Sequence, residues 1–183
     1  MEEEKSGTAE TTIGQQFNPV ELKDLRLACK QFAMLYFHFC KTLKDTLGEE
    51  KALPLVQKAV FELSLDRTNR AREMAAALGL KTTMENFSKV NDLPQMAWSC
   101  WKEEMGGVRC PYAEVWLGYF ADNPWFKCFA SLYCDVIDTT NAENFTRTTS
   151  HKITKNLLWG DTSCEHEYFE SNAVKEGKLT YKT

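Results

Sequence analysis

The sequence predicts an α+β protein in which an N-terminal layer of helices packs on a small antiparallel sheet formed by the C-terminal half. Two observations lead to this prediction. Apolar residues recur at spacings of three and four over most of residues 18–90, which is the period of an amphipathic helix. Two short segments joined by a turn-forming stretch follow near the C-terminal end, and such a pair is typical of a β-hairpin. Helices first and strands later favour α+β over alternating α/β.

The chain is expected to form one domain, because two domains within 183 residues would each be small for a self-sufficient core. Hydrophobic residues make up 43% of the chain, which is enough to bury one core. Residues 1–17 are expected to be a flexible N-terminal tail. Residues 18–183 form the domain, helical over 18–90, mixed strand and helix over 91–170, and ending in a polar tail over 171–183.

The first helix is expected to begin at Asn18-Pro19, since asparagine can cap the free amides and proline suits the first helical position. Gly48 is expected to end it. Its apolar positions are Leu22, Leu25, Cys29, Phe32, Ala33, Tyr36, Phe37, Cys40 and Leu43.

A second helix follows, in which Pro54 is tolerable only within the first turn, because proline lacks the amide hydrogen that interior positions donate. Asp66 or Thr68 is expected to cap a separate third helix that ends at Gly79. A short amphipathic segment near residues 84–90 completes the helical half.

After Pro94 the segments become shorter and richer in aromatic residues. Residues 96–105 alternate roughly between apolar and polar and are expected to form a strand. Pro111 suits the first position of a helix over 111–116, and residues 125–136 are apolar at helical spacing. Residues 152–159 and 164–169 are then expected to pair as the hairpin.

Composition limits the class of partner. The formal charge is −4, with 22 basic and 26 acidic residues and no basic cluster, which argues against nucleic acid. No stretch of about 20 residues lacks charges, so no membrane span is expected. Seven cysteines without an export signal indicate a cytoplasmic protein with reduced thiols. A small-molecule substrate is compatible with these limits, and oligomer formation stays open.

Cys110 is the first candidate site residue. It stands just before a helix that begins with Pro111, and the positive end of a helix dipole lowers the pKa of a nearby thiol. The alternative is a small buried residue that ends a strand.

Cys134 and Asp138 form the second candidate. If residues 125–138 are helical, the two side chains lie on one face at i and i+4, where a thiolate and a carboxylate could share a metal or a proton. The alternative is that Cys134 only packs.

Cys164 and His166 form the third candidate, because side chains two residues apart on a strand point to the same face. With Cys110 and Cys134 they would complete a set of three thiolates and one imidazole for zinc or another divalent metal. The alternative is a solvated His166. The other two histidines, His38 and His151, are expected to be structural.

Three segments resemble, in order, the motifs of the L-2-amino-thiazoline-4-carboxylate hydrolase family. They are a Cys-Pro step at 110–111, a helix with Cys134 and Asp138, and a closing Gly-Asp-Thr-Ser-Cys run at 160–164. The resemblance covers most of the chain beyond the tail. It departs at 141–149, which lacks the family's glycine and proline, and at His166, where an aromatic residue is common. Members of this family also resemble small-molecule-binding domains of the 4-vinyl reductase type, with a helical layer against an antiparallel sheet.

The resemblance implies hydrolytic opening of a cyclic amidine or isothiourea ring. The expected catalytic residues are Cys110, Asp138 and Asp161, which match the family's motifs, and His166, which departs from them but could handle protons. The resemblance places Tyr112, Arg147 and Trp159 at the substrate. A metal-bound water or a direct attack by Cys110 could open the ring, and a non-catalytic sensor that binds a small molecule or a metal with the same fold is the alternative function.

Overall fold

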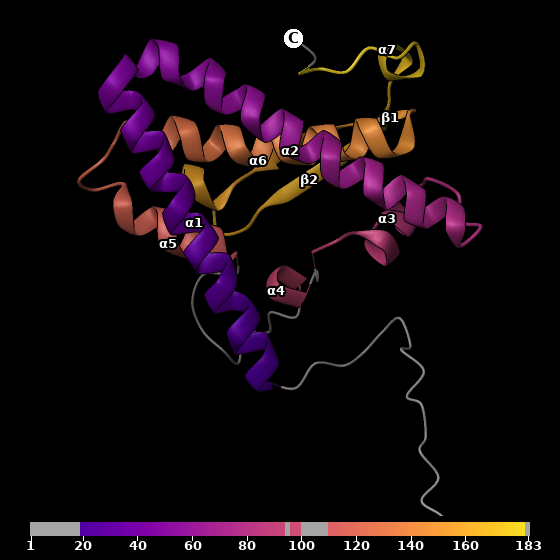
Figure 1. The fold of residues 1–183 in the computed structure, drawn as a ribbon, viewed down its shortest axis with the longest axis horizontal. Coiled ribbons are helices and arrows are strands. Elements are labelled where there is room, and N and C mark those ends of the chain that lie inside the picture. The colour runs from indigo at the N-terminus through magenta and orange to yellow at the C-terminus, as the bar shows by residue number, and fades with distance from the viewer. Residues whose placement is uncertain (1–18, 94–95, 100–109, 182–183) are drawn as a thin grey trace, which may run out of the picture.

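The computed structural model describes residues 19–93, 96–99 and 110–181. Over these residues the prediction of an α+β fold is confirmed, with helices throughout the N-terminal half and a two-stranded antiparallel sheet in the C-terminal half (Figure 1). No helix in the described part of the chain combines the length and apolar character needed to cross a bilayer. The elements are α1 (Pro19–Leu47), α2 (Glu49–Ala77), α3 (Met84–Val90), α4 (Met96–Ser99), α5 (Pro111–Tyr119), α6 (Phe126–Thr146), β1 (Thr149–Lys155), the 3₁₀ turn η2 (Leu157–Trp159), β2 (Glu165–Glu170) and α7 (Asn172–Lys175).

Gly48 ends α1 as predicted. Its φ of 81° lies in the left-handed region that glycine adopts without strain, and its amide donates to the Lys44 carbonyl at 2.9 Å. The same residue precedes α2, so the two long helices meet at a one-residue corner (Figure 1). The expected cap at Asn18 lies outside the described residues.

The prediction of separate second and third helices is wrong, because α2 runs without a break past Asp66 and Thr68. Thr68 is not a cap: its hydroxyl donates to the Ser64 carbonyl within the helix at 2.7 Å. Pro54 also lies beyond the first turn of α2, where it removes one helical hydrogen bond. The buried side chains of Ala52 and Val56 on either side of it hold this part of α2 against the core.

The expected strand over 96–105 is corrected where the structure describes it, since Met96–Ser99 forms the short helix α4. The remainder, 100–109, lies outside the described residues. Arg26 of α1 holds α4 in place by donating from Nη1 to the carbonyl of Ala97 at 2.7 Å. Its Nη2 also donates to Glu114 of α5 at 2.9 Å, so one guanidinium joins three helices.

Helix α6 is longer than the apolar pattern predicts, because it continues through Thr146. The extra turns are polar yet buried, and several of their polar side chains have partners in the protein, although the Thr140 hydroxyl has none among the described residues. Asn144 donates to the Thr68 hydroxyl at 2.5 Å, and Asn141 accepts from the Ser64 hydroxyl at 2.8 Å. A buried polar group costs little when it is hydrogen-bonded, which is why this face of α6 can pack on α2.

The hairpin prediction is confirmed in its pairing, although β1 both begins and ends earlier in the chain than expected. β1 pairs antiparallel with β2, with His151 opposite Tyr168 and Ile153 opposite His166. A register irregularity follows between Ile153 and Lys155. Residues 157–159 form η2 instead of extending the strand.

Helix α6 lies between the N-terminal helices and the sheet, with α2 on one side and β1 on the other (Figure 1). The main core joins α1, α2, α5 and α6 around large aromatic side chains, of which Trp116, Phe126 and Phe129 are fully buried. The Trp116 indole donates to the Ala33 carbonyl at 2.9 Å, so its polar atom is satisfied inside the core.

The described part of the segment expected as a polar tail is folded. Ser171 accepts a hydrogen bond from the Val174 amide at the start of α7, and Val174 is buried. Further on, Thr180 is hydrogen-bonded to Glu143, and the Tyr181 hydroxyl donates to Asp135. The segment is polar in composition, but these contacts fix it to α6.

Candidate functional site

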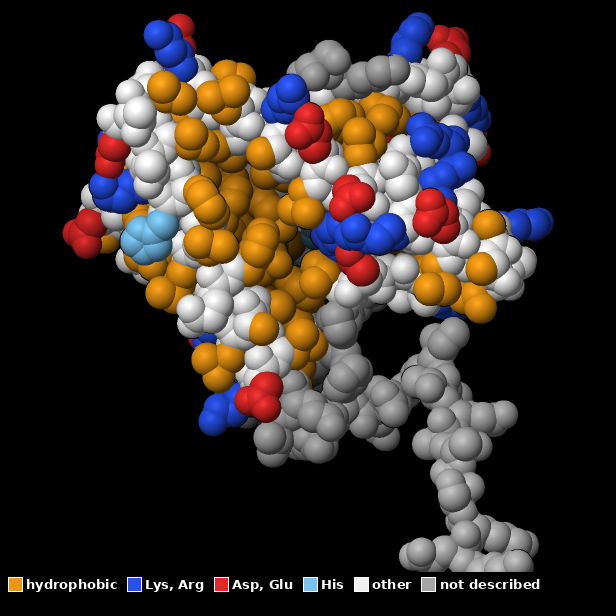
Figure 2. All heavy atoms as spheres, in the orientation of Figure 1, with side chains coloured by type: hydrophobic (Ala, Val, Ile, Leu, Met, Phe, Trp, Pro, Cys, Tyr) orange, Lys and Arg blue, Asp and Glu red, His pale blue; other side chains and the backbone are white. Residues whose placement is uncertain are grey.

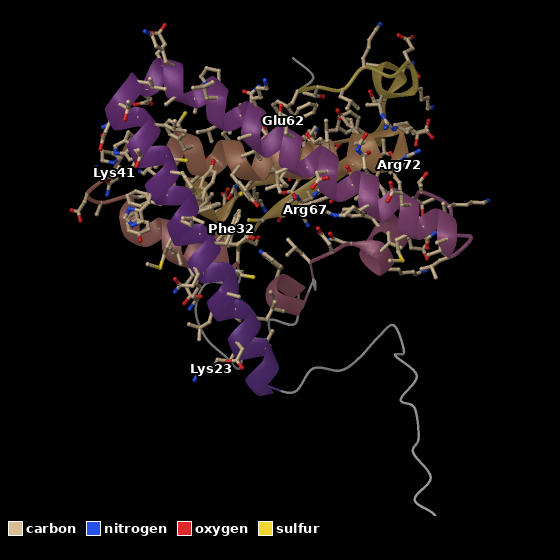
Figure 3. The ribbon with its side chains drawn as sticks, viewed as in Figure 1. Lys23, Phe32, Lys41, Glu62, Arg67 and Arg72 are labelled. Carbon is tan, nitrogen blue, oxygen red and sulfur yellow. The ribbon has the colours of Figure 1, made fainter. Side chains whose placement is uncertain are left out.

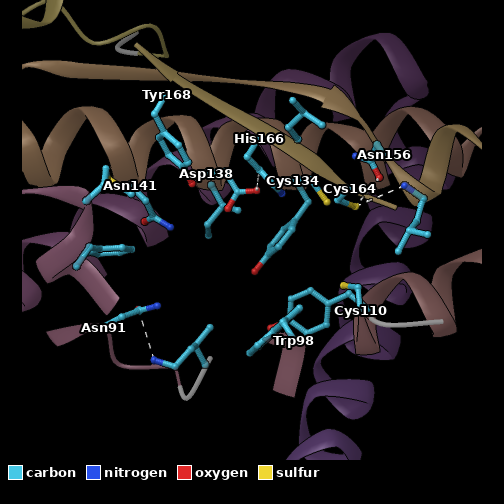
Figure 4. A pocket seen from close by; sticks show the side chains of 18 of the residues that line it. Asn91, Trp98, Cys110, Cys134, Asp138, Asn141, Asn156, Cys164, His166 and Tyr168 are labelled. Carbon is cyan, nitrogen blue, oxygen red and sulfur yellow. Dashed lines mark hydrogen bonds and ion pairs between the residues drawn. The ribbon is translucent and has the colours of Figure 1, made fainter. Parts of the chain in front are cut away.

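One cavity of about 610 Å³ lies where the helices meet the hairpin. Its walls come from α2, α3, α4, α5, α6, η2 and both strands, so segments distant in sequence contribute to one space. The volume is in the range of pockets that hold small organic ligands. Figure 4 shows its labelled side chains directed around a common opening.

The three predicted thiols all line this cavity, together with Asp138, His166 and Tyr112. Cys110 and Tyr112 are placed by the start of α5, and Cys134 and Asp138 lie one turn apart on α6. Figure 4 shows Cys134 and Cys164 close together on one wall, with Cys110 opposite them at the same end. The structure therefore brings together in one cavity the residues that the three motifs singled out.

The electrostatic state of Cys110 differs from the expectation. Cys110 does precede the first residue of α5, but burial raises the pKa of its thiol to about 11. The backbone amides of Ala113 and Tyr112 act in the opposite direction, as a helix N-terminus should, and are outweighed. At Cys110 burial therefore favours the neutral thiol over the expected thiolate.

The other two thiols are also shifted toward the protonated form. Burial raises the pKa of Cys134, and the nearby carboxylate of Asp138 adds to the effect. Burial likewise raises the pKa of Cys164, which is held at the end of the hairpin turn by the amide of Leu157 at 3.5 Å. A neutral thiol gives the cavity wall a moderate polarity and is a weak nucleophile.

Asp138 is the acidic group of the cavity. Although 35% of its side-chain surface is exposed, burial of the carboxyl group in the protein raises its pKa to about 7. The cation of Arg67 lowers this pKa and the neighbouring Asp135 raises it, both to a smaller extent. A carboxyl group with a pKa near neutrality is the kind that exchanges protons in enzyme sites.

Beside Asp138 the hairpin places a pair of histidines. His151 and Tyr168 are opposite each other, and His166 stands two residues before Tyr168, so all three share the sheet face that looks toward α6. The His151 Nε2 atom lies 2.9 Å from His166 Nδ1, and that same Nδ1 lies 4.0 Å from Asp138 Oδ2. Burial lowers the pKa of His151 to about 4 and also lowers the pKa of His166.

The spacing of ligand atoms bears on where an ion could bind. Among the described residues, Asp138, His151 and His166 each offer one ligand atom, and these three atoms lie within 4.8 Å of one another. This group shares His166 with the expected ligand set but contains none of the three thiols. His151, expected to be structural, belongs to it.

Three residues implied by the resemblance do not line the cavity. Asp161 accepts the backbone amide of Asn156 at 2.8 Å and so shapes the turn that carries η2. Arg147 is exposed and ends α6 with a φ of 62°. Trp159 is 54% exposed and donates to the Ser131 hydroxyl at 3.2 Å.

Among the cavity residues that the sequence did not single out, two carry polar groups that a ligand could use. Arg67 extends from α2 toward the segment after α3, whereas Lys23 and Lys41 of α1 point away from the molecule (Figure 3). Its Nε donates to Asp92 at 2.8 Å and its Nη2 to Asn91 at 3.0 Å. Because no other described residue is hydrogen-bonded to this guanidinium, its Nη1 is available to a ligand.

Asn156 is the second missed residue. Its side-chain oxygen accepts from the Leu158 amide at 2.9 Å, while its buried Nδ2 has no hydrogen-bonding partner in the described part of the chain. A buried unpaired donor is costly unless a ligand or solvent supplies an acceptor. In the sequence Asn156 is a single polar residue before Leu157, and no motif marks it as a site residue.

A second hollow of about 240 Å³ lies between α1 and α2 and has almost purely apolar walls. Phe32, Tyr36 and Phe39 of α1 line it, and Figure 2 shows hydrophobic side chains gathered in a continuous band over these helices. Apart from Cys40 and two tyrosine hydroxyls it contains no reactive group. The chemistry is therefore concentrated in the larger cavity.

The chain was also compared with known proteins. The resemblance described above rests on the sequence motifs of the C-terminal half. No family model, no curated protein and no solved structure matches this chain.

Proposed function

We propose that this protein is a hydrolase of the L-2-amino-thiazoline-4-carboxylate hydrolase type, which opens a small cyclic amidine or isothiourea that carries a carboxylate. The observation that carries the proposal is the composition of the cavity. Arg67, the pair of Asp138 and His166, and three neutral thiols face one space of about 610 Å³. A cation, proton-exchanging groups and walls of low polarity suit a small, anionic heterocycle.

The reaction adds one water molecule across the ring. The water oxygen bonds to the carbon between sulfur and nitrogen, and the C–S bond breaks with its electron pair leaving on sulfur. One proton of the water goes to that sulfur and the other to the ring nitrogen. For the thiazoline substrate the product is an N-carbamoyl cysteine with a free thiol.

The cavity residues divide the work as follows. The Arg67 Nη1 binds the substrate carboxylate, because a guanidinium forms charge-assisted hydrogen bonds with carboxylates. Asp138 and His166 hold and activate the attacking water. The unpaired Nδ2 of Asn156 donates a hydrogen bond to an atom bonded to the attacked carbon, where negative charge develops during the reaction. Water is the proposed nucleophile instead of Cys110, since the Cys110 thiol is protonated near neutral pH.

The second candidate function is a binding module that captures the same kind of ligand without converting it. It is favoured by one observation, namely that burial raises the pKa of all three cavity thiols and makes them unreactive walls. A reducing cytoplasm would suit either function, because the thiols must stay reduced.

The experiment is a thiol-release assay with L-2-amino-thiazoline-4-carboxylate. Protein is removed by filtration before the thiol is measured, because the chain itself has seven cysteines. We expect release by the native chain and at least about a hundredfold loss in Asp138→Asn, the scale of an acid–base contribution. The exposed Asp122→Asn is the matched control. Saturable binding without thiol release would favour the binding module, and the absence of both would overturn the proposal.

A further inference from the structure

We propose that Asp138, His151 and His166 form a binding site for one divalent transition-metal ion of the zinc class. The inference rests on the placement of three side chains from α6, β1 and β2. None of the pairings considered from the sequence includes His151.

The distances suit a shared ion. Two ligand atoms that are each about 2.1 Å from an ion lie about 3.0–3.4 Å apart at tetrahedral or octahedral angles. His151 Nε2 and His166 Nδ1 are 2.9 Å apart, and His166 Nδ1 and Asp138 Oδ2 are 4.0 Å apart. All three atoms fall within 4.8 Å of one another, so small side-chain rotations would bring them to bonding distance.

The surroundings hold His151 in the orientation a ligand needs. Its Nδ1 lies 3.3 Å from the Thr139 hydroxyl of α6, and the Tyr168 ring packs against it at 5.0 Å between centroids. With Nε2 on the ion, Nδ1–H would donate to Thr139. A metal-bound histidine commonly donates its second ring N–H to an oxygen in this way. His151 is 4% exposed, so this orientation is fixed by packing.

Two of the three side chains face the large cavity. Asp138 and His166 line the large cavity, whereas His151 stands behind them and does not. Three protein ligands with the remaining coordination positions facing a pocket are typical of catalytic zinc sites, and structural sites are instead closed by a fourth protein ligand. A ligand or a water molecule could therefore reach the ion from the cavity.

The donor set selects the class of ion. Two imidazoles and one carboxylate suit zinc, cobalt, nickel or iron(II), whereas calcium and magnesium prefer oxygen ligands throughout. Arg67 faces the same cavity, so the ion would work alongside a fixed cation on an anionic ligand. When bound, such an ion lowers the pKa of its water. This catalytic use rests on the proposed hydrolysis, but the binding itself does not.

The test uses the full chain after removal of metal with a chelator. Zinc chloride is titrated by calorimetry and cobalt chloride by visible absorption. We expect one ion per chain and cobalt d–d bands without a sulfur-to-cobalt charge-transfer band. Asp138→Asn, His151→Gln and His166→Gln should each weaken binding at least about tenfold. His38→Gln, the exposed third histidine, should bind as the native chain does.

The controls separate folding and thiol binding from the proposed site. Asp138 and His166 are each about one-third exposed, so their variants should fold even if the buried His151→Gln does not. Replacing Cys110, Cys134 and Cys164 together by serine should leave the stoichiometry unchanged. A sulfur charge-transfer band, or full affinity in both Asp138→Asn and His166→Gln, would overturn the site.

Activity is read separately. Zinc binding at these three residues without thiol release would support this inference and contradict the hydrolase. Undiminished thiol release from the chelated protein would contradict a catalytic ion while leaving the hydrolase in place.

Discussion

Glu143 and Thr180 lie 37 residues apart in the chain, yet the Thr180 backbone amide donates to Glu143 Oε2 at 2.7 Å and its hydroxyl donates to Oε1 at 2.6 Å. The Ser150 hydroxyl of β1 donates to the same carboxylate, also at 2.6 Å. Glu143 itself is 1% exposed. One buried side chain of α6 therefore holds both the C-terminal segment and the first strand of the hairpin.

Glu143→Gln should destabilise the protein by about 3 kcal/mol, because the amide nitrogen must face a donor and leaves buried groups unpaired. Urea unfolding monitored by circular dichroism gives the free energy of unfolding. The exposed Glu176→Gln is the control and should change it by less than about 0.5 kcal/mol. A native-like value for Glu143→Gln would mean that this network contributes little to stability.

Arg67→Met should raise the KM for a carboxylate substrate about 10- to 100-fold, since one charge-assisted hydrogen bond is lost while the aliphatic length is kept. The value of kcat should change less, because the carboxylate is bound equally in the ground and transition states. Steady-state thiol release measures both constants. Arg70→Met, one turn away on the exposed face of α2, should leave them unchanged; an equal effect there would argue against a specific anchor.

Cys110 should react slowly with iodoacetamide at neutral pH, and its rate should continue to rise about tenfold per pH unit up to its pKa of about 11. The rate rises with pH because burial favours the protonated thiol and leaves little thiolate until the pH approaches that value. Mass spectrometry of labelled peptides gives the rate at each cysteine, with the exposed Cys128 as internal reference. Faster labelling of Cys110 than of Cys128 at neutral pH would restore the nucleophile hypothesis.

Substitutions at two adjacent threonines of α6 should distinguish an effect on zinc binding from an effect on the stability of the fold. Thr139→Val removes the hydroxyl beside His151 and should weaken zinc binding about 10-fold. Thr140→Val removes a buried hydroxyl that has no hydrogen-bond partner among the described residues, so it should stabilise the fold by about 1 kcal/mol and leave zinc affinity unchanged. Calorimetric titration and thermal unfolding measure the two effects. Equal zinc affinity in both variants would exclude the positioning role of Thr139.

The parts of the fold that follow a simple apolar period could be predicted from the sequence. Helix α1 is of this kind, and its end at Gly48 and the hairpin were predictable because a glycine stop and a turn-forming stretch are also local signals. The continuity of α2 could not be predicted, because Asp66 and Thr68 have the chemistry of a helix start and only their tertiary contacts show otherwise. The last turns of α6 were missed for a related reason, since buried polar residues such as Asn144 resemble a loop until their partners are known.

The residues of the candidate site also differ in whether they could be predicted from the sequence. Residues on one element at a fixed spacing, such as Cys134 and Asp138, could be paired from the sequence. His151 could not be paired with His166, because their meeting depends on the register between β1 and β2. Arg67 is one of several basic residues on a polar helix, and its direction into the cavity follows from Asn91 and Asp92 beyond α3. Long-range geometry of this kind leaves no local pattern.

Helix α6 presents Cys134 and Asp138 to the cavity and, further along the same rod, Glu143 to the C-terminal segment. Each residue of an α-helix advances the side-chain direction by about 100°. A single-residue insertion between Asp138 and Glu143 would therefore rotate one of the two side chains away from its partners, although neither residue had changed. Related chains that keep this architecture should therefore tolerate length variation at the ends of α6 and not within it.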